Sequence, residues 1–106
     1  MIDISTLKQY EIIKGYKAKF IHTENNTLAF WEIEKGAVMP VHAHRHEQST
    51  LVIEGKFKLT IGEKSEVYKD GLVVVIPPNV AHGGVALTDC KLFDIFSPVR
   101  EDYKKL

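Results

Sequence analysis

The sequence predicts an all-β protein, a small barrel or a double-sheet jelly roll. Short runs rich in β-branched and aromatic residues recur along the chain, and clusters of turn-forming residues separate them. No segment keeps helical periodicity for more than about two turns, and only residues 5–10 and 100–106 leave room for a short helix. The recurrence of strand and turn signals at short intervals therefore favours paired strands over a helical fold.

Five extended runs carry this prediction, and each is bounded by residues that end strands. The runs are residues 28–33, 49–53, 57–61, 72–76 and 91–96. Glycine, asparagine and proline supply the backbone angles of the turns between them. These turns are predicted at residues 25–26, 35–36, 54–55, 62–64, 70–71 and 77–79.

Size and charge narrow the possible functions. At 106 residues and 12.0 kDa, the chain is expected to form one domain over residues 1–106. Acidic and basic residues number 14 each, and no block of lysine or arginine occurs, so no nucleic-acid partner is expected. The longest apolar run, Leu72 to Ile76, is too short to cross a membrane, and no membrane partner is expected.

The ends of the chain and its cysteine usage predict a cytoplasmic location. Met1 to Tyr10 carries Asp3, Ser5 and Lys8 in place of the apolar core of a signal peptide. The single cysteine, Cys90, has no partner for an internal disulfide, which fits a reducing compartment. We expect Cys90 to be a buried small side chain and not a nucleophile.

A histidine-rich stretch is the first candidate for chemistry. In an extended chain, side chains alternate between faces, so His42, His44, His46 and Gln48 share one face and Glu47 points the other way. This parity favours Gln48 over Glu47 as the inward group. Two imidazoles two residues apart reach one ion if the strand is concave or bulged. The alternative is a solvated, histidine-rich edge segment.

Two spaced motifs resemble the paired signatures of the cupin superfamily. The first lies in residues 36–55 and the second in residues 71–86. In the first, Gly36 is followed after five residues by His42, after one by His44, after three by a ligand slot at Gln48, and after six by Gly55. In the second, Gly71 is followed after five residues by Pro77, after one by Asn79 and after two by His82. The resemblance implies a single small cupin barrel, a double-stranded β-helix or jelly roll, whose motif strands pair around a metal ion.

Two positions of the second motif depart from the cupin pattern. Asn79 stands where glycine is frequent, and asparagine tolerates the left-handed conformation better than most residues. Ala86 stands where the signature often ends in asparagine, and this change leaves the metal ligands untouched.

The resemblance implies one divalent transition metal (Zn, Ni, Fe, Mn or Cu) held by His42, His44, Gln48 and His82. Four neutral ligands leave the charge of the ion uncompensated, which favours an anionic substrate and Lewis-acid chemistry. Two alternatives stay open, a solvated Gln48 and a turn-capping His82. His46 has no slot in the motif and is expected at the rim or behind the ligands, and His22 is expected to be exposed.

The C-terminal strand and tail, residues 90–106, supply a third group of candidates. Asp94 shares its parity with apolar neighbours, so its carboxylate is expected to be buried or to face a cavity. Arg100 follows a Ser-Pro break and can return to the barrel mouth, where its planar fork suits a carboxylate. Asp94, Phe96 and Arg100 resemble the Asp-x-Phe-x-x-x-Arg pattern of KdgF-type cupins, where it surrounds the substrate.

This group has its own alternatives. Asp94 and Arg100 can instead form a structural ion pair that closes the barrel end, and Phe96 can belong to the core.

The resemblance implies an isomerase-like enzyme that acts on a small anionic sugar. It would convert 4,5-unsaturated monouronates, released from pectin or alginate, into linear ketouronates. Arg100 and the metal would hold the carboxylate while Asp94 moves the proton. The alternatives are a cupin dioxygenase with a small organic substrate and a non-catalytic cupin that binds a sugar or a metal. Apolar residues on both faces of 72–76 also predict a homodimer through the outer sheet.

Overall fold

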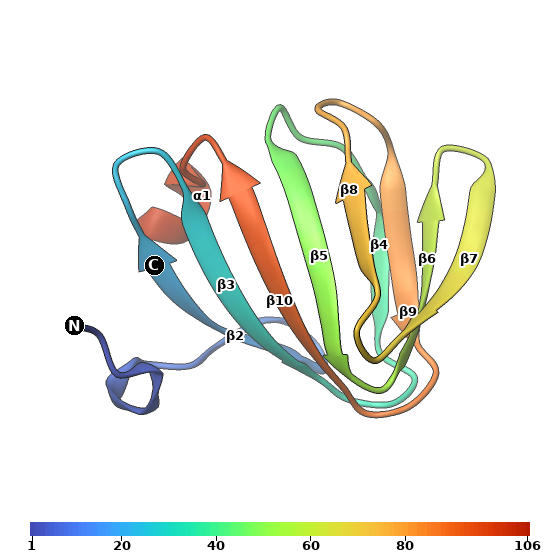
Figure 1. The fold of residues 1–106 in the computed structure, drawn as a ribbon, viewed down its shortest axis with the longest axis horizontal. Helices are drawn as coiled ribbons and strands as arrows, with labels where there is room; N and C mark the ends of the chain where they lie inside the picture. Colours follow the sequence, from blue (N-terminus) through green and yellow to red (C-terminus); the bar gives the residue numbers. More distant parts are fainter.

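The computed structural model describes residues 1–106, and ten strands form two antiparallel sheets. The larger sheet has the order β1-β2-β3-β10-β5-β8 and the smaller sheet the order β4-β9-β6-β7. In Figure 1 most strands of the larger sheet lie on the left and those of the smaller sheet on the right. The strands are β1 (Tyr10–Ile13), β2 (Tyr16–His22), β3 (Thr27–Ile33), β4 (Val38–His42), β5 (Glu47–Glu54), β6 (Lys56–Ile61), β7 (Lys64–Lys69), β8 (Val73–Ile76), β9 (His82–Ala86) and β10 (Cys90–Ser97).

All five strands that the extended runs predicted are present, as β3, β5, β6, β8 and β10. The other five strands carry weaker local signals. Charged residues fill half of β7, and two adjacent glycines stand in β9, although glycine is depleted in strands. Tertiary pairing supplies what local propensity lacks, because β9 lies between β4 and β6 and hydrogen-bonds to both.

Two short helices lie in the segments where the sequence left room for them. A 3-10 helix, η1, covers Ile4–Thr6, and the α-helix α1 covers Glu101–Lys104. The Asp3 carboxylate accepts a hydrogen bond from the Ser5 backbone N–H and so caps η1. No helix of the structure has the length and apolar composition needed to cross a membrane.

The core lies between the two sheets, where alternate residues of each strand point inward. Burial alternates along β3 and β10, as expected for strands with one face against a core. Tyr16 packs edge-to-face against Trp31 and Phe57, with ring centroids 6.1 and 6.5 Å apart. Such aromatic contacts join the larger sheet to the smaller one.

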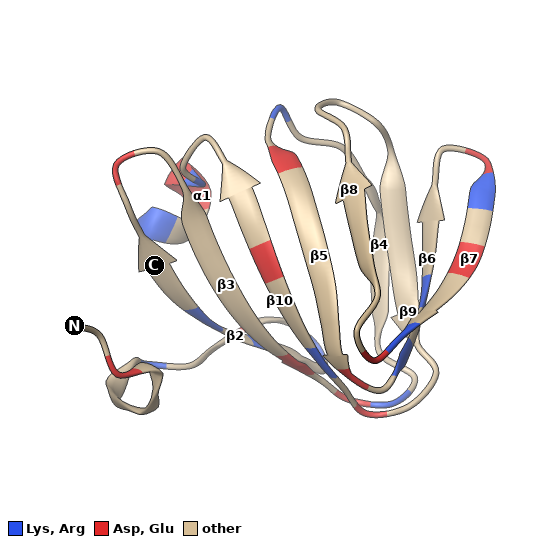
Figure 2. Ribbon diagram, in the orientation of Figure 1, with Lys and Arg blue, Asp and Glu red and all other residues tan.

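Charged residues lie mainly at turns and strand ends, as Figure 2 shows. The red band within β10 is an exception, and it corresponds to Asp94, the one acidic residue of that strand. Asp94 is 4% exposed. A carboxylate in this position requires hydrogen-bond partners or a function, because burial disfavours its charged form.

The backbone between the histidines departs from the single extended run that parity assumed. Strand β4 ends at His42, residues 43–46 form a loop, and β5 begins at Glu47. Within β5 the parity prediction holds locally, because Gln48 is half-buried whereas Glu47 is exposed. Asn79 adopts φ 63°, so the left-handed conformation predicted for it is confirmed.

Candidate metal centre

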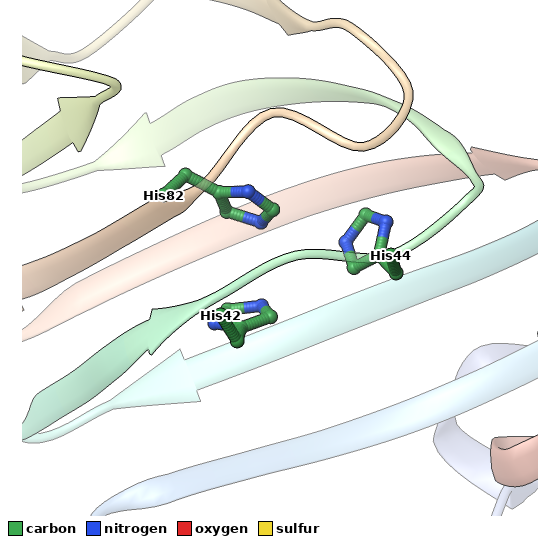
Figure 3. Close-up of side chains that lie close together, drawn as sticks. All are labelled: His42, His44 and His82. Atoms are coloured by element: carbon green, nitrogen blue, oxygen red, sulfur yellow. The ribbon is translucent and has the colours of Figure 1, made fainter.

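Three histidines from separate parts of the chain gather at one end of the smaller sheet. His42 ends β4 and pairs in register with His82, the first residue of β9, while His44 lies in the loop that follows β4. Their ligand nitrogens all lie within 4.8 Å of one another. Figure 3 shows the three rings grouped around a common space. This is the arrangement expected of side chains that share one cation.

Backbone carbonyls fix the tautomer of all three histidines. Each Nδ1 lies within hydrogen-bond distance of a carbonyl oxygen two residues away, at 2.8 Å for His42, 3.0 Å for His44 and 2.9 Å for His82. A carbonyl oxygen only accepts, so each Nδ1 carries the proton and each Nε2 presents a lone pair. Metal-binding histidines are commonly oriented in this way.

The Nε2 atom of His82 shows that the group fits a cation. This atom is buried and has no hydrogen-bond partner. A buried lone pair without a donor is costly, and a metal ion at the histidine cluster would satisfy it. The residues present therefore fit the metal that cupin barrels hold.

Burial keeps two of these imidazoles neutral. Desolvation, followed by the positive charge of Arg100 and the coulombic cost of charging His44 beside His82, lowers the pKa of His44 to about 4. Desolvation also lowers the pKa of His82. Neutral imidazole is the form that binds metal, so neither ligand has to lose a proton near pH 7.

Gln48 extends this cluster through a directed amide. Its Nε2 donates to Thr50 Oγ1 and to Asp94 Oδ2, both at 3.2 Å. The amide oxygen Oε1 consequently faces His44 Nε2 at 3.1 Å. Because His44 Nδ1 holds the ring proton, two lone pairs meet at this contact, and a cation shared by both atoms would relieve their repulsion.

Asp94 lies behind Gln48 and is held by two donors. Thr50 Oγ1 donates to Asp94 Oδ1 at 2.6 Å, and Gln48 Nε2 donates to the other oxygen. Burial raises the pKa of Asp94 to about 6, and the hydrogen bonds from Thr50 and Gln48 limit that rise. A carboxyl with a pKa near the working pH can both take up and release a proton.

Arg100 does not pair with Asp94. Its Nε and Nη2 donate to Asp102 at 2.9 and 2.7 Å, a bidentate contact. The guanidinium carbon lies 4.7 Å from the ring centre of Phe96 and 4.0 Å from that of Tyr103. The ion pair between Asp94 and Arg100, one of the alternatives from the sequence, is therefore absent.

All the candidate residues except His44 line one cavity. Its polar lining consists of His42, Gln48, Thr50, His82, Asp94 and Arg100. Aromatic and aliphatic side chains form the remaining wall, and Phe96 belongs to it while also being buried in the core. The structure thus brings together the residues of all three sequence motifs.

Several residues of this cavity were not predicted from the sequence, among them Trp31, Thr50 and Tyr103. Thr50 has the parity of Gln48 within β5, a signal that identifies it as inward-facing. Trp31 also faces inward, and its Nε1 is buried without a hydrogen-bond partner. The placement of Tyr103 depends on how the tail folds back, so no local signal reveals it.

The two remaining histidines have different outcomes. His46 is 8% exposed and lies outside the cluster, with its Nε2 3.2 Å from the Val99 carbonyl oxygen. The prediction that His22 is exposed is wrong, because His22 Nδ1 lies 2.9 Å from Thr27 Oγ1 and its ring stacks on Phe20. The alternation of β2 gives His22 this half-buried position.

Comparison with known families gives one match. Residues 29–96 match the family model described as Cupin domain. Among curated proteins, the chain is 24% identical over 85 residues to an uncharacterized protein of Streptomyces coelicolor. The aligned region covers 79% of this chain and 81% of that protein.

Solved structures share the same architecture. An RmlC-like cupin from Shewanella frigidimarina is 34% identical, with a TM-score of 0.89 over 93% of this chain and 90% of the other. KdgF from Halomonas sp. is 29% identical, with a TM-score of 0.85 over 91% and 90%. Salicylate 1,2-dioxygenase from Pseudoaminobacter salicylatoxidans shares the fold at 16% identity, with a TM-score of 0.77 over 80% of this chain and 27% of that one.

Proposed function

This chain belongs to the cupin family, and we propose that it is a metal-dependent enzyme that converts 4,5-unsaturated monouronates into linear ketouronates. The observation that carries the proposal is the shared cavity, where the imidazoles of His42 and His82, a buried carboxyl and an arginine meet, with His44 beside them in the histidine cluster. Two likenesses support an unsaturated uronate as the substrate. The chain carries the Asp-x-Phe-x-x-x-Arg pattern that resembles KdgF-type cupins, and it is similar to KdgF from Halomonas sp..

We propose that His42, His44, His82 and Gln48 hold one divalent ion. When bound, the ion supplies Lewis-acid stabilisation for negative charge on a substrate oxygen. Neutral ligands leave the full charge of the ion available, so the cavity favours an anion. Arg100 adds a second positive group on the cavity lining, and we assign it to the substrate carboxylate.

Asp94 is the proton carrier in this proposal. Ring opening removes the proton of the anomeric hydroxyl, breaks the bond between C1 and the ring oxygen, adds a proton to that oxygen, and leaves an aldehyde at C1 and an enol at C5. Ketonisation then removes the enol proton and adds a proton to C4, so substrate and product are isomers. A carboxyl with a pKa near 6 can accept one proton and deliver the other.

The surroundings of Asp94 assist these transfers. Thr50 and Gln48 fix the position of the carboxyl through hydrogen bonds, so its orientation is set before substrate binds. The apolar wall of the cavity limits the access of water that would compete for the same protons.

An anaerobic assay tests the proposal against the dioxygenase alternative. We expect the zinc-loaded protein to remove the ultraviolet absorbance of unsaturated galacturonate or mannuronate without oxygen, and NMR to show the linear ketouronate. A dioxygenase needs oxygen, and the ligand set lacks the carboxylate of two-His-one-carboxylate iron sites. No acceleration over the spontaneous conversion with any metal would refute the proposed reaction and leave the dioxygenase or the non-catalytic binding protein.

Variants assign the roles within the same assay. We expect Arg100→Lys to raise KM, because a point charge replaces a bidentate fork. We expect Asp94→Asn to lower kcat, because the proton carrier is lost. Asp94 also directs the Gln48 amide, so metal content must be measured in each variant and rates compared per metal-loaded protein. An Asp94→Asn variant as fast as wild type would contradict the mechanism.

We also propose that the protein is a homodimer formed through the outer face of the larger sheet. Two mainly apolar rows of side chains cross this face in register. One passes through Phe30, Phe93, Leu51 and Val73, and the other passes through Leu28, Ile95, Ser49 and Val75, where Ser49 is the one polar member. Val73 and Val75 are 60% and 53% exposed. The rows carry no charge, so two copies can meet about a two-fold axis without like-charge repulsion.

A further inference from the structure

We propose that Asp102 is a positioning residue that leaves one edge of the Arg100 guanidinium free for the substrate carboxylate. The inference rests on the proposed function, because it specifies how the anionic sugar is recognised. Asp102 is absent from the sequence motifs that predicted the site, and its role emerges only from its contacts with Arg100.

The contacts divide the guanidinium into an occupied edge and a free edge. Asp102 accepts from Nε and from Nη2, so it takes the side edge of the group. Asp102 accepts no hydrogen bond from Nη1, and Nη2 retains a second hydrogen. The Nη1–Nη2 edge is thus the one remaining pair of parallel donors, and it matches the two oxygens of a carboxylate.

Burial indicates where the free edge lies. The Asp102 side chain is 58% exposed, whereas that of Arg100 is 9% exposed. Asp102 therefore reaches the guanidinium from the solvent side, and Arg100 itself lines the cavity. The adjacent Nη1–Nη2 edge is the one available to a ligand in the cavity.

The arginine is held at both ends of its side chain. Its backbone N–H donates to Thr27 Oγ1 at 2.9 Å, and its carbonyl oxygen accepts from the Lys104 N–H at 3.0 Å in α1. The guanidinium packs against the rings of Phe96 and Tyr103. Asp102 completes this fixation by blocking rotation about the last side-chain bonds, which reduces the entropy lost when a carboxylate binds.

The charge of Asp102 opposes its positioning effect. Positioning strengthens carboxylate binding, whereas the negative charge weakens it, so the two effects predict opposite results when Asp102 is replaced. A nearby carboxylate cancels part of the positive field of Arg100 and so weakens the attraction for an anion. If Asp102 acted only through this charge, its removal would tighten anion binding. If it acts by positioning, its removal weakens carboxylate binding despite the more positive site.

The test compares two ligands in two variants of the zinc-loaded protein by calorimetry. D-galacturonate supplies the carboxylate, and galacturonamide is its uncharged counterpart. We expect Asp102→Asn to weaken galacturonate binding about tenfold, because Arg100 loses its charge-assisted contact with Asp102. Galacturonamide binding should be unchanged. Asp102→Glu, which can restore the bidentate contact, should recover at least part of this loss. Glu101→Gln removes the same charge from an exposed neighbour in α1 and should leave both affinities unchanged.

Each result has a defined meaning. Equal or tighter galacturonate binding by Asp102→Asn overturns the positioning role, and so does an equal loss for both ligands, which indicates a general structural effect. If wild type itself does not distinguish galacturonate from galacturonamide, the carboxylate assignment of Arg100 fails, and the proposed function fails with it. If wild type binds galacturonate selectively but has no turnover, Asp102 still positions Arg100 in a binding protein.

Discussion

Each histidine of the cluster is oriented by a backbone carbonyl near it in the chain and not by a second side chain. The ring orientation therefore depends on the local turn geometry at the ends of β4 and β9. This arrangement leaves three lone pairs without donors and makes the cluster a ready cation site.

The first prediction concerns metal binding. We expect wild type to contain about one divalent ion per chain and the His42→Ala/His82→Ala double variant to contain none, because two ligands are lost. Elemental analysis of purified protein measures this directly. His22→Ala is the matched control, since His22 lies outside the cluster. A double variant with the metal content of wild type would show that other residues hold the ion.

The second prediction concerns the charge of the fourth ligand. We expect Gln48→Glu to retain the metal and to bind galacturonate more weakly, because a carboxylate cancels part of the field of the ion. The substitution also places two carboxylates together, since Gln48 Nε2 lies 3.2 Å from Asp94 Oδ2. One of the two carboxyls must then remain protonated. Calorimetry measures the affinity, and unchanged or tighter binding would contradict the assignment of Gln48.

The third prediction follows from the raised pKa of Asp94. Its pKa is about 6 in the folded protein and about 3.9 in an unfolded chain. The folded state therefore holds this proton more tightly, so the contribution of Asp94 to stability is complete below pH 4 and is lost as the pH rises to about 6. Above pH 6, the ionised Asp94 lowers the free energy of unfolding by about 3 kcal/mol, because its folded and unfolded pKa values differ by roughly two units.

Asp94→Asn removes this cost from the metal-free protein. We expect the variant to be more stable than wild type by about 1–3 kcal/mol at pH 7.5, with no such gain at pH 4. Urea unfolding in a chelator, followed at both pH values, measures the difference. A variant whose stability relative to wild type is the same at the two pH values would contradict the assignment of a proton to Asp94.

At the scale of elements, β9 shows how packing overrides local propensity. Its two adjacent glycines weaken any strand signal, yet both allow close packing. A Cβ at Gly84 would collide with the ring of Phe57, and a Cβ at Gly83 would lie 2.9 Å from the Met39 carbonyl oxygen. The glycines thus let β9 fit between its neighbours and place His82 in the cluster.

The fourth prediction tests this packing. We expect Gly84→Ala to lower the free energy of unfolding by about 1–3 kcal/mol, because the added methyl group overpacks the core. Val85→Ala is the control on the same strand, where the side chain is only half-buried. Chemical denaturation of both variants gives the values. A Gly84→Ala variant as stable as wild type would mean that Phe57 moves aside without cost.

At the scale of the whole molecule, the two sheets leave an apolar outer face on the larger one. The fifth prediction is that wild type sediments as a dimer and that Val75→Glu sediments as a monomer with an unchanged circular dichroism spectrum. A buried charge in the interface is costly without a partner. Val67→Glu is the control, because Val67 is 50% exposed on the smaller sheet. A monomeric wild type at micromolar concentration would refute the dimer.

The sequence by itself determined the all-β class, five of the strands and most of the polar residues that line the cavity, with Thr50 as the exception. It succeeded because strand runs and motif spacings are local features, and Asp94 and Gln48 could be oriented from strand parity alone. The tertiary structure alone decided the pairing of β9 between β4 and β6, the loop between His42 and Gln48, and the partner of Arg100. The pairing of β9 depends on where distant segments meet, and Tyr103 reaches the cavity because the tail folds back onto the barrel. Asp102 lies only two residues from Arg100, but strand parity does not extend into the tail, so the sequence could not choose between Asp102 and Asp94 as its partner. A side chain's parity can be read along one strand, whereas contacts between strands and tail need the folded chain.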